Sequence, residues 1–356
     1  MKLKIYSQFD SELCSKWIEL ESNATITVFQ TYYFQKIWHE KVGIKLKKFI
    51  HIFVYENNQE VIAIYPLQYS SLKFLNIINF LASEQSDYSG PLLNNKYLNS
   101  IDYDYIWGTI FSFLGKNNIY SFDKVPIDPA LLSVGQFNKF TIAGTDQSHA
   151  LNFNKSYRLS NISDLRRQIR KISVMGGFKF KILKHNQIDF FNNYSDFTIM
   201  KNERLKQQNK RKLFLGVGLY DFYLDLLVNN KTSHIFKIYS LQFDGTVVAS
   251  CFSAVLNGRY YYLIPAYKIG FLSYSWGSIL IYYLIRFSKK MGLKSFDMTI
   301  GGEAYKRKYC NSRVNLVSYF YSDNPFLKYY LVFKIMKINL KKNKYLVNIL
   351  NNFGIK

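Results

Sequence analysis

Three apolar runs rich in aromatic and β-branched residues follow one another in the second half of the chain. They cover residues 234–243, 246–256 and 259–268. The dipeptides Asp244-Gly245 and Asn257-Gly258 separate them. Both dipeptides suit the positive φ angles that a type I′ turn requires at its two central positions. The pattern therefore predicts a three-stranded antiparallel meander.

A helix and a further strand follow the meander. Residues 277–292 carry apolar side chains at helical spacing and end at Gly292, a suitable helix C-cap. Residues 294–300 form a short apolar run that predicts a buried strand. The chain then continues through two glycines into a segment of basic and aromatic residues.

The start of this helix has two interpretations. A loop that opens a helix directly after a strand can bind an anion, because the N–H groups of the first turn are unpaired and point outward. Alternatively, Gly277 only allows the helix to begin close to the sheet. For Gly277 taken by itself, the second interpretation is favoured.

Upstream, the pattern predicts a helix over 161–173, a strand over 176–183 and a helix over 187–203. A basic stretch at 201–212 follows, with six Lys or Arg residues against one Glu. This stretch is either a solvated loop or a loop that binds phosphate.

The first half of the chain repeats the same order of elements. Two helices come first, then antiparallel strands, a helix and a strand. The expected ranges are 10–21 and 31–42, then 47–55, 60–69 and 72–82, then 101–114, then 118–125. The sequence predicts an α/β protein of two similar modules, each a mostly antiparallel mixed sheet flanked by helices. The expected domains are 1–150, 151–322 and a basic amphipathic helical tail at 323–356, with a linker through 126–148.

Composition narrows the class of protein. With 48% hydrophobic residues among 356, the chain can bury a core, and 47 Lys and Arg against 24 Asp and Glu give a net charge of +23. Such a charge favours a polyanionic partner, such as nucleic acid, an anionic membrane surface or a phosphate-rich molecule. Codon bias toward Lys, Asn, Ile, Tyr and Phe explains the same excess equally well.

Several classes of chemistry lack their motifs. The three cysteines are far apart and form no CxxC pair, and the five histidines form no HxxxH motif and no Ser/His/Asp spacing. The sequence also has no GxGxxG and no phosphate-binding GxxxxGK[ST] motif. We therefore expect no disulfide framework, no metal and no nicotinamide or ATP chemistry. No signal peptide or membrane-spanning run is evident, which predicts a cytoplasmic protein.

Longer motifs carry a family resemblance over nearly the whole chain to about residue 320. The most specific motif is FDxxxGxxxYK, present as FDMTIGGEAYK at 296–306. It is accompanied by LRRQIRKISVMGGFKFKI, VVASCFSAVLNGRYYYLIPAY, FQTYYFQKIW, EVIAIYPL and SDYSGPLL. In this order they resemble the CelD-like GNAT-fold acyltransferases of cellulose and surface-polysaccharide biosynthesis. That class is similar to the FemAB peptidyltransferases, which carry two tandem GNAT-like domains. Unlike ordinary GNAT proteins, the chain has one glycine in its SYSWGS loop.

The resemblance implies an acyltransferase of two tandem GNAT-like modules, the second being catalytic. Acetyl-CoA or another acyl-CoA would donate the acyl group. The acceptor would be a sugar, a nucleotide-sugar or a lipid-linked cell-envelope precursor. The residues implied to bind the acyl-CoA are Leu263, Ile264, Pro265, Tyr274, Ser275, Trp276, Gly277 and Ser278. In the same reading, the thioester oxygen would meet a backbone N–H of the strand at 263–266.

The resemblance also suggests individual roles. Tyr305 would be the general acid that protonates the leaving thiolate, Asp297 would orient the following loop or act as a base, and Glu303 would be a second base candidate. The remaining implied residues would bind substrate, namely the basic Lys306, Lys308 and Arg204, and the Asp87-Tyr88 pair. Lysine suits phosphate as a mobile point charge.

Two alternatives to acyl-CoA chemistry remain open. FemAB-like proteins take their acyl group from aminoacyl-tRNA, and a net charge of +23 suits tRNA. A non-catalytic basic scaffold at the inner face of the membrane is the other, because the tail at 325–356 alternates lysines with apolar residues as an amphipathic helix on anionic lipid would.

Overall fold

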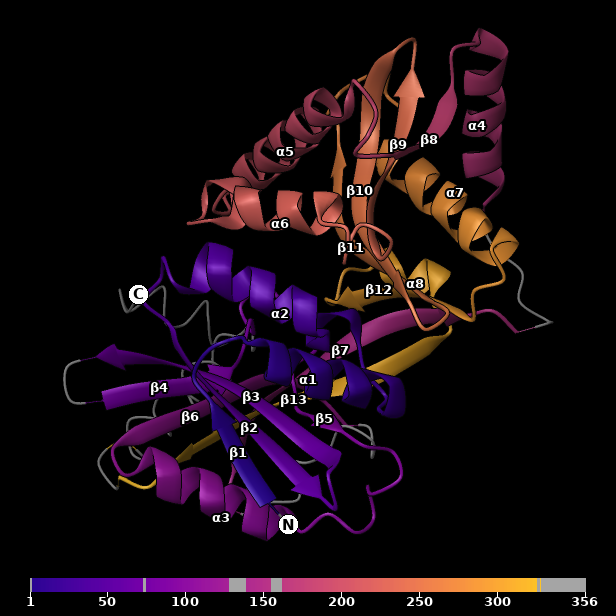
Figure 1. The fold of residues 1–356 in the computed structure, drawn as a ribbon. Coiled ribbons are helices and arrows are strands. Elements are labelled where there is room, and N and C mark those ends of the chain that lie inside the picture. The colour runs from indigo at the N-terminus through magenta and orange to yellow at the C-terminus, as the bar shows by residue number, and fades with distance from the viewer. Residues whose placement is uncertain (1, 73–74, 128–138, 155–161, 325–326, 328–356) are drawn as a thin grey trace, which may run out of the picture. The chain divides into compact units, whose positions relative to one another are not determined.

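The computed structural model describes residues 2–72, 75–127, 139–154, 162–324 and 327 (Figure 1). The chain divides into two compact units. The first contains the residues up to Gln35, Lys47–Gln147 and, among the described residues, those from Val314 onward. The second contains Lys36–Leu46 and Ser148–Arg313.

The first unit is built on a mixed sheet with strand order β1-β2-β3-β4-β6-β13. The strands are β1 Lys2–Tyr6, β2 Phe49–Asn57, β3 Glu60–Leu72, β4 Leu75–Phe80, β6 Asn118–Pro126 and β13 Ser312–Ser322, with the short β5 Leu92–Leu93 beside β3. Neighbours are antiparallel except β4 and β6. The helices are α1 Ser11–Asn23, α2 Tyr32–Trp38 (which runs into the second unit) and α3 Tyr103–Leu114. Helix α3 buries Ile106, Trp107 and Ile110 in the core of this unit.

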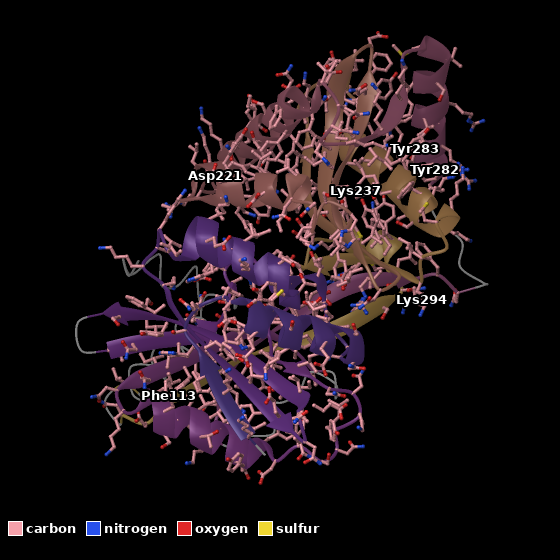
Figure 2. All side chains as sticks on the ribbon, in the orientation of Figure 1. Phe113, Asp221, Lys237, Tyr282, Tyr283 and Lys294 are labelled. Carbon is pink, nitrogen blue, oxygen red and sulfur yellow. The ribbon has the colours of Figure 1, made fainter. Side chains whose placement is uncertain are left out.

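The second unit repeats the arrangement with the order β7-β12-β11-β10-β9-β8. Its strands are β7 Thr141–Asn152, which contributes residues from Ser148 on, β8 Lys179–Leu183, β9 Phe236–Phe243, β10 Thr246–Leu256, β11 Arg259–Tyr267 and β12 Ser295–Ile300. Among these strands, β11 and β12 form the parallel pair. The helices are α4 Ser163–Met175, α5 Phe190–Gln207, α6 Leu219–Val228, α7 Trp276–Lys290 and α8 Lys306–Tyr309, with a π-helical turn at His39–Gly43 and a 3₁₀ turn at Leu213–Leu215. On α7, Tyr283 stacks against Phe180 of β8 at 5.7 Å between ring centroids (Figure 2).

The predicted meander and the repeat of the two halves are confirmed. Strands β9, β10 and β11 pair antiparallel in sequence order, and the turn residues Asp244 and Gly245 have φ of 45° and 73°. Asn257 and Gly258 have φ of 50° and 75°. In each unit an antiparallel meander is followed by a helix and then by a strand parallel to the last meander strand. The prediction of two α/β modules with mixed sheets therefore holds.

The ends of the modules differ from the expected layout. Residues 141–148 lie in strand β7, so the linker expected through 126–148 is wrong over that part. Strand β13 pairs with β6 of the first sheet, although it follows the second module in the chain. The expected boundary at 150 and the helical character of the tail stay predictions, and most of 323–356 lies outside the described residues.

The segment Lys36–Leu46 joins the second unit through charge pairs and one close backbone contact. Lys41 pairs with Asp225 of α6 at 3.3 Å. Lys45 pairs at 3.2 Å with Asp221, the α6 residue labelled in Figure 2. Gly218 precedes α6 with a φ of +69°, and a Cβ there would lie 1.9 Å from the carbonyl oxygen of Lys41. Both the backbone angle and the space therefore require glycine at this position.

We expect Gly218→Ala to lower the free energy of unfolding by about 2–5 kcal/mol, because it adds a backbone clash to an unfavourable φ. Gly270→Ala is the matched control, since Gly270 has a φ of +70° and a Cβ added there would meet nothing within 4 Å. That control is expected to cost about 1–2 kcal/mol. Urea unfolding of both variants measures the difference, and equal costs would contradict the role of the Lys41 contact.

Candidate functional site

A cavity of about 390 Å³ lies in the second unit beside the part of β11 that does not pair with β12. Strands β11 and β12 pair only from Arg259 to Tyr261, opposite Ser295 to Asp297. Beyond these residues β11 continues to Tyr267 without pairing to β12. The wall of the cavity comes from the far end of β11, the loop after it, the first turn of α7 and two side chains from other elements. The lining residues are Arg204, Tyr262, Pro265, Tyr267, Lys268, Ile269, Gly270, Tyr274, Ser275, Trp276, Gly277, Ser278, Ile281 and Tyr305.

A β-bulge shapes the cavity side of β11. Phe252 of β10 pairs with Ile264 and Ser253 pairs with Tyr262, so Leu263 is the extra residue. The N–H groups of Leu263 and Ile264 lie against the Cys251 thiol. Burial nevertheless raises the pKa of that thiol to about 12, so it stays neutral.

Pro265 follows the bulge and reduces by one the backbone N–H groups expected to bind the thioester oxygen. Pro265 lines the cavity but has no N–H, so it cannot hydrogen-bond a thioester oxygen through its nitrogen. Its carbonyl oxygen instead accepts from two cationic side chains of α5, described below. If a backbone N–H of residues 263–266 binds the thioester oxygen, as the resemblance implies, it belongs to a residue of this segment other than Pro265.

The first turn of α7 forms the opposite part of the wall. The Ser275 N–H at the N-cap donates to Oε1 of Gln168 at 3.0 Å, whereas the N–H groups of Gly277 and Ser278 belong to a first turn that has no intrahelical acceptors. A Cβ on Gly277 would lie 3.1 Å from the ring of Tyr267. Close packing thus explains the glycine, as expected for Gly277 alone, and the same packing brings the helix N-terminus to the cavity.

Tyr305, the residue just before α8, also lines the cavity. Burial raises the pKa of its phenol well above the ordinary value, and Glu303 adds to the rise while Arg204 opposes it. The hydroxyl therefore stays protonated at neutral pH. A neutral phenol in a cavity carries the proton that a departing thiolate takes up, although the raised pKa makes it a weaker acid than an exposed tyrosine.

Asp297 shapes the loop that carries Tyr305. Its side chain is 1% exposed, and Oδ1 accepts from the Thr299 N–H at 2.7 Å. Oδ2 lies 3.5 Å from Arg259. Thr299 has a φ of 56°, an uncommon angle for a β-branched residue, which the Asp297 hydrogen bond helps to hold. The Asp297 carboxylate is thus engaged by the Thr299 N–H and the Arg259 guanidinium, and its functional role stays a prediction.

Glu303 and Lys306 form the second half of this loop. The Lys306 ammonium is buried, donates to the Ile300 carbonyl at 2.6 Å and pairs with Glu303 at 3.0 Å. A Cβ on Gly301, whose φ is +131°, would lie 2.2 Å from Glu303 Oε2. Burial raises the pKa of the Glu303 carboxyl, but the positive charge of Lys306 lowers it, and the net effect is a lowered pKa. Within this loop Lys306 acts as an internal anchor.

Arg204 and its neighbour Lys201 bring positive charge to the cavity from α5. The Arg204 guanidinium lies 4.4 Å from the centroid of the Tyr267 ring and donates to the Pro265 carbonyl at 3.4 Å. Lys201 donates to the same oxygen at 3.4 Å. Burial lowers the pKa of Lys201 to about 8, with Arg204 adding to the effect.

The structure brings together most of the residues implied for acyl-CoA and separates several others. Eight of the implied residues line the cavity: Arg204, Pro265, Tyr274, Ser275, Trp276, Gly277, Ser278 and Tyr305. Leu263 and Ile264 lie at the bulge of the adjoining strand, and Lys308 is exposed on α8. Asp87 and Tyr88 belong to the first unit, where the Tyr88 ring lies 6.0 Å from Phe29.

Sequence reasoning missed part of the wall. The missed lining residues are Tyr262, Tyr267, Lys268, Ile269, Gly270 and Ile281. Lys201 was missed as well, although its spacing from Arg204 places both on one face of a helix and could have paired them. Among the described residues, no group of three or more His, Cys, Asp or Glu side chains is arranged to hold a metal ion. No helix in the described part of the chain has the length and apolarity needed to cross a membrane.

Comparison with known proteins places the cavity inside a known domain. Residues 160–307 match the model of the acetyltransferase (GNAT) domain, and this range contains every residue of the cavity wall. No curated protein matches the chain in sequence.

Solved structures share the fold of the whole chain. FemX is similar with a TM-score of 0.63 and 10% identity, over 92% of this chain and 98% of that one. L-PGS from Bacillus licheniformis is similar with a TM-score of 0.56 and 12% identity, over 94% and 98%. The C-terminal domain of an Agrobacterium fabrum protein assigned as a lysylphosphatidylglycerol synthetase has a TM-score of 0.57 and 12% identity, over 92% and 96%. At such identities the likeness concerns the fold alone. A GNAT acetyltransferase domain model thus matches residues 160–307, and on this match the protein is an acyltransferase by class.

Proposed function

We propose that the chain transfers an acyl group, acetyl in the simplest case, from acyl-CoA to a nitrogen or oxygen of a cell-envelope precursor. The acceptor class is a sugar, a nucleotide-sugar or a lipid-linked glycan. The observation that carries the proposal is the cavity itself, which joins a helix N-terminus to a protonated tyrosine across the gap between two diverging strands. This arrangement offers donors for phosphate at one end and an acid for a leaving thiolate at the other.

In the proposed reaction the acceptor nitrogen or oxygen attacks the thioester carbonyl carbon and forms a tetrahedral intermediate. The carbon–sulfur bond then breaks, and the Tyr305 hydroxyl gives its proton to the departing thiolate. The proton lost by the acceptor passes to a base, for which the candidate is Glu303, an ionised carboxylate that is paired with Lys306. Asp297 acts indirectly, by holding the loop that presents Tyr305.

Binding of the acyl-CoA is assigned to residues on both sides of the gap. The first turn of α7 would hold the pyrophosphate through the N–H groups of Gly277 and Ser278. Tyr274 and Trp276 would flank it, and the segment at 263–265 would border the thioester. Lys308 is exposed, so it stays a proposed substrate ligand together with the Asp87-Tyr88 pair.

The alternative donor is aminoacyl-tRNA, as in the FemAB family that the sequence resembles. The likeness in fold to FemX and the net charge of +23 favour it. Filter binding of bulk tRNA over a range of salt concentrations, beside calorimetry with acetyl-CoA and free CoA, separates the two donors. The scaffold hypothesis rests on the tail at 325–356, nearly all of which lies outside the described residues. In that hypothesis the protein makes peripheral contact with the anionic, cytoplasmic surface of the membrane.

We expect Tyr305→Phe to reduce acyl transfer by about 10²- to 10⁴-fold while leaving the affinity for CoA unchanged, because only the proton donor is removed. The measurement is release of free CoA from acetyl-CoA with a panel of free and nucleotide-linked amino sugars, beside calorimetric CoA binding. Tyr220→Phe, at an exposed position of α6, is the matched control and should keep full activity. Full activity of Tyr305→Phe would remove Tyr305 from the mechanism.

We expect Gly277→Asp to abolish CoA binding, since it adds a carboxylate where the helix N-terminus would bind phosphate. Gly277→Asn, which has the same size without the charge, serves as the control for crowding against Tyr267. The Asn variant should bind CoA more weakly than the wild type but clearly better than the Asp variant, as measured by calorimetry. Equal binding by the two variants would show that charge at this turn is irrelevant.

A further inference from the structure

Two cationic side chains from one helix face share a single acceptor beside the cavity. Lys201 and Arg204 lie one turn apart on α5, and each donates to the Pro265 carbonyl at 3.4 Å. A distance of 3.4 Å is long for a hydrogen bond from a charged donor, which normally lies at about 2.7–2.9 Å. Neither cation is therefore well satisfied by this oxygen.

Neither cation has an anionic partner within the described part of the chain. No Asp or Glu oxygen there lies within 4.0 Å of Lys201 or Arg204, and the Nε of Arg204 is buried without a hydrogen-bond partner. Close pairs of buried like charges are unfavourable, because each charge has lost water and repels the other. An arrangement of this kind is stable when a ligand supplies the missing negative charge.

The other charged groups near Lys201 do not supply it. Lys210, in the loop after α5, adds to the positive potential. The Cys251 thiol of β10 is neutral because its pKa is about 12. The negative charge of Glu303 raises the pKa of Lys201, but the Glu303 carboxylate is paired with Lys306. The net field at Lys201 is therefore positive, in agreement with its pKa of about 8.

We propose that Lys201 and Arg204 form a phosphoryl-binding subsite at the Pro265 side of the cavity. The proposal rests on the proposed function and deepens it, since it gives the bound substrate a phosphoryl group close to the reacting centre. This group belongs either to the acceptor, as in a sugar phosphate or nucleotide-sugar, or to CoA. Arg204 presents a planar fork and Lys201 a point charge, a combination suited to a phosphoryl group.

The same geometry makes anion binding depend on protons. A dianion stabilises the ammonium form of Lys201, so its pKa rises when the anion binds. Below pH 8 the amine is already protonated and binding needs no proton. Above pH 8 each binding event takes up a proton from solution, and affinity falls as the pH rises.

Calorimetric titration with inorganic pyrophosphate at constant ionic strength tests the subsite directly. We expect Lys201→Met and Arg204→Met each to weaken binding by about ten- to hundredfold relative to the wild type at pH 7.5. Lys206→Met, from an exposed position on the same helix, is the control and should bind as the wild type does. Unchanged binding in both site variants overturns the proposal.

Lys201→Arg provides the second test. This variant can still refute the proposal if a Met variant does not fold. Arginine retains the charge but does not titrate, so this variant should bind pyrophosphate at pH 7.5 and lose the extra affinity decrease between pH 7.5 and 9.5 that the wild type shows. Because pyrophosphate itself titrates, the difference between the two proteins isolates Lys201. Identical pH profiles, or loss of binding in Lys201→Arg, contradict the subsite and favour a neutral Lys201 that acts as a base.

A third arm identifies the source of the phosphoryl group. Pyrophosphate that still binds to protein saturated with CoA occupies an acceptor subsite, whereas competition by CoA assigns the pair to the phosphates of CoA. A failure of the protein to bind acetyl-CoA together with retained, Lys201-dependent pyrophosphate binding would refute the proposed donor while leaving the subsite intact. The two proposals can thus fail separately.

Discussion

The early separation of β11 from β12 is the feature on which the site depends. In a parallel strand pair, evenly spaced, slanted hydrogen bonds join the two backbones along the ladder. Here the ladder stops at Tyr261 and Asp297, and the bulge at Leu263 and the donor-free Pro265 follow immediately on β11. The cavity beside this part of β11 is lined by side chains of neighbouring elements and by the first turn of α7. Cavity, helix N-terminus and candidate catalytic tyrosine therefore share one structural origin.

The FDxxxGxxxYK segment comprises the end of β12 and the loop after it, and its polar contacts position one side chain. Asp297 fixes the backbone of Thr299, Gly301 leaves room for the Glu303–Lys306 pair, and Lys306 ties the loop back to the Ile300 carbonyl. The polar and small residues of the loop thus have internal partners, whereas Tyr305 faces the cavity. The motif therefore contains both residues that hold the backbone and a residue that faces the cavity.

The net charge of +23 does not show which basic residues lie close to the cavity. Among the residues that the structure describes, most basic side chains are exposed, where water and salt screen them. Arg204 instead lines the cavity, and Lys201 donates together with it to the Pro265 carbonyl oxygen. Burial and mutual repulsion make this pair responsive to a bound anion, whereas codon bias toward lysine is sufficient to explain much of the remaining excess.

The sequence determined the elements whose signals are local, and tertiary structure decided the rest. The Asp244-Gly245 and Asn257-Gly258 turns, the periodicity of α7 and the order of the two modules needed only neighbouring residues, because turn and helix preferences act over short distances. The return of β13 to the first sheet, the end of the β11–β12 ladder and the meeting of Lys201 and Arg204 at Pro265 depend on pairings distant in sequence. Periodicity carries no information about such pairings, since strand order and close approach are set by packing between elements.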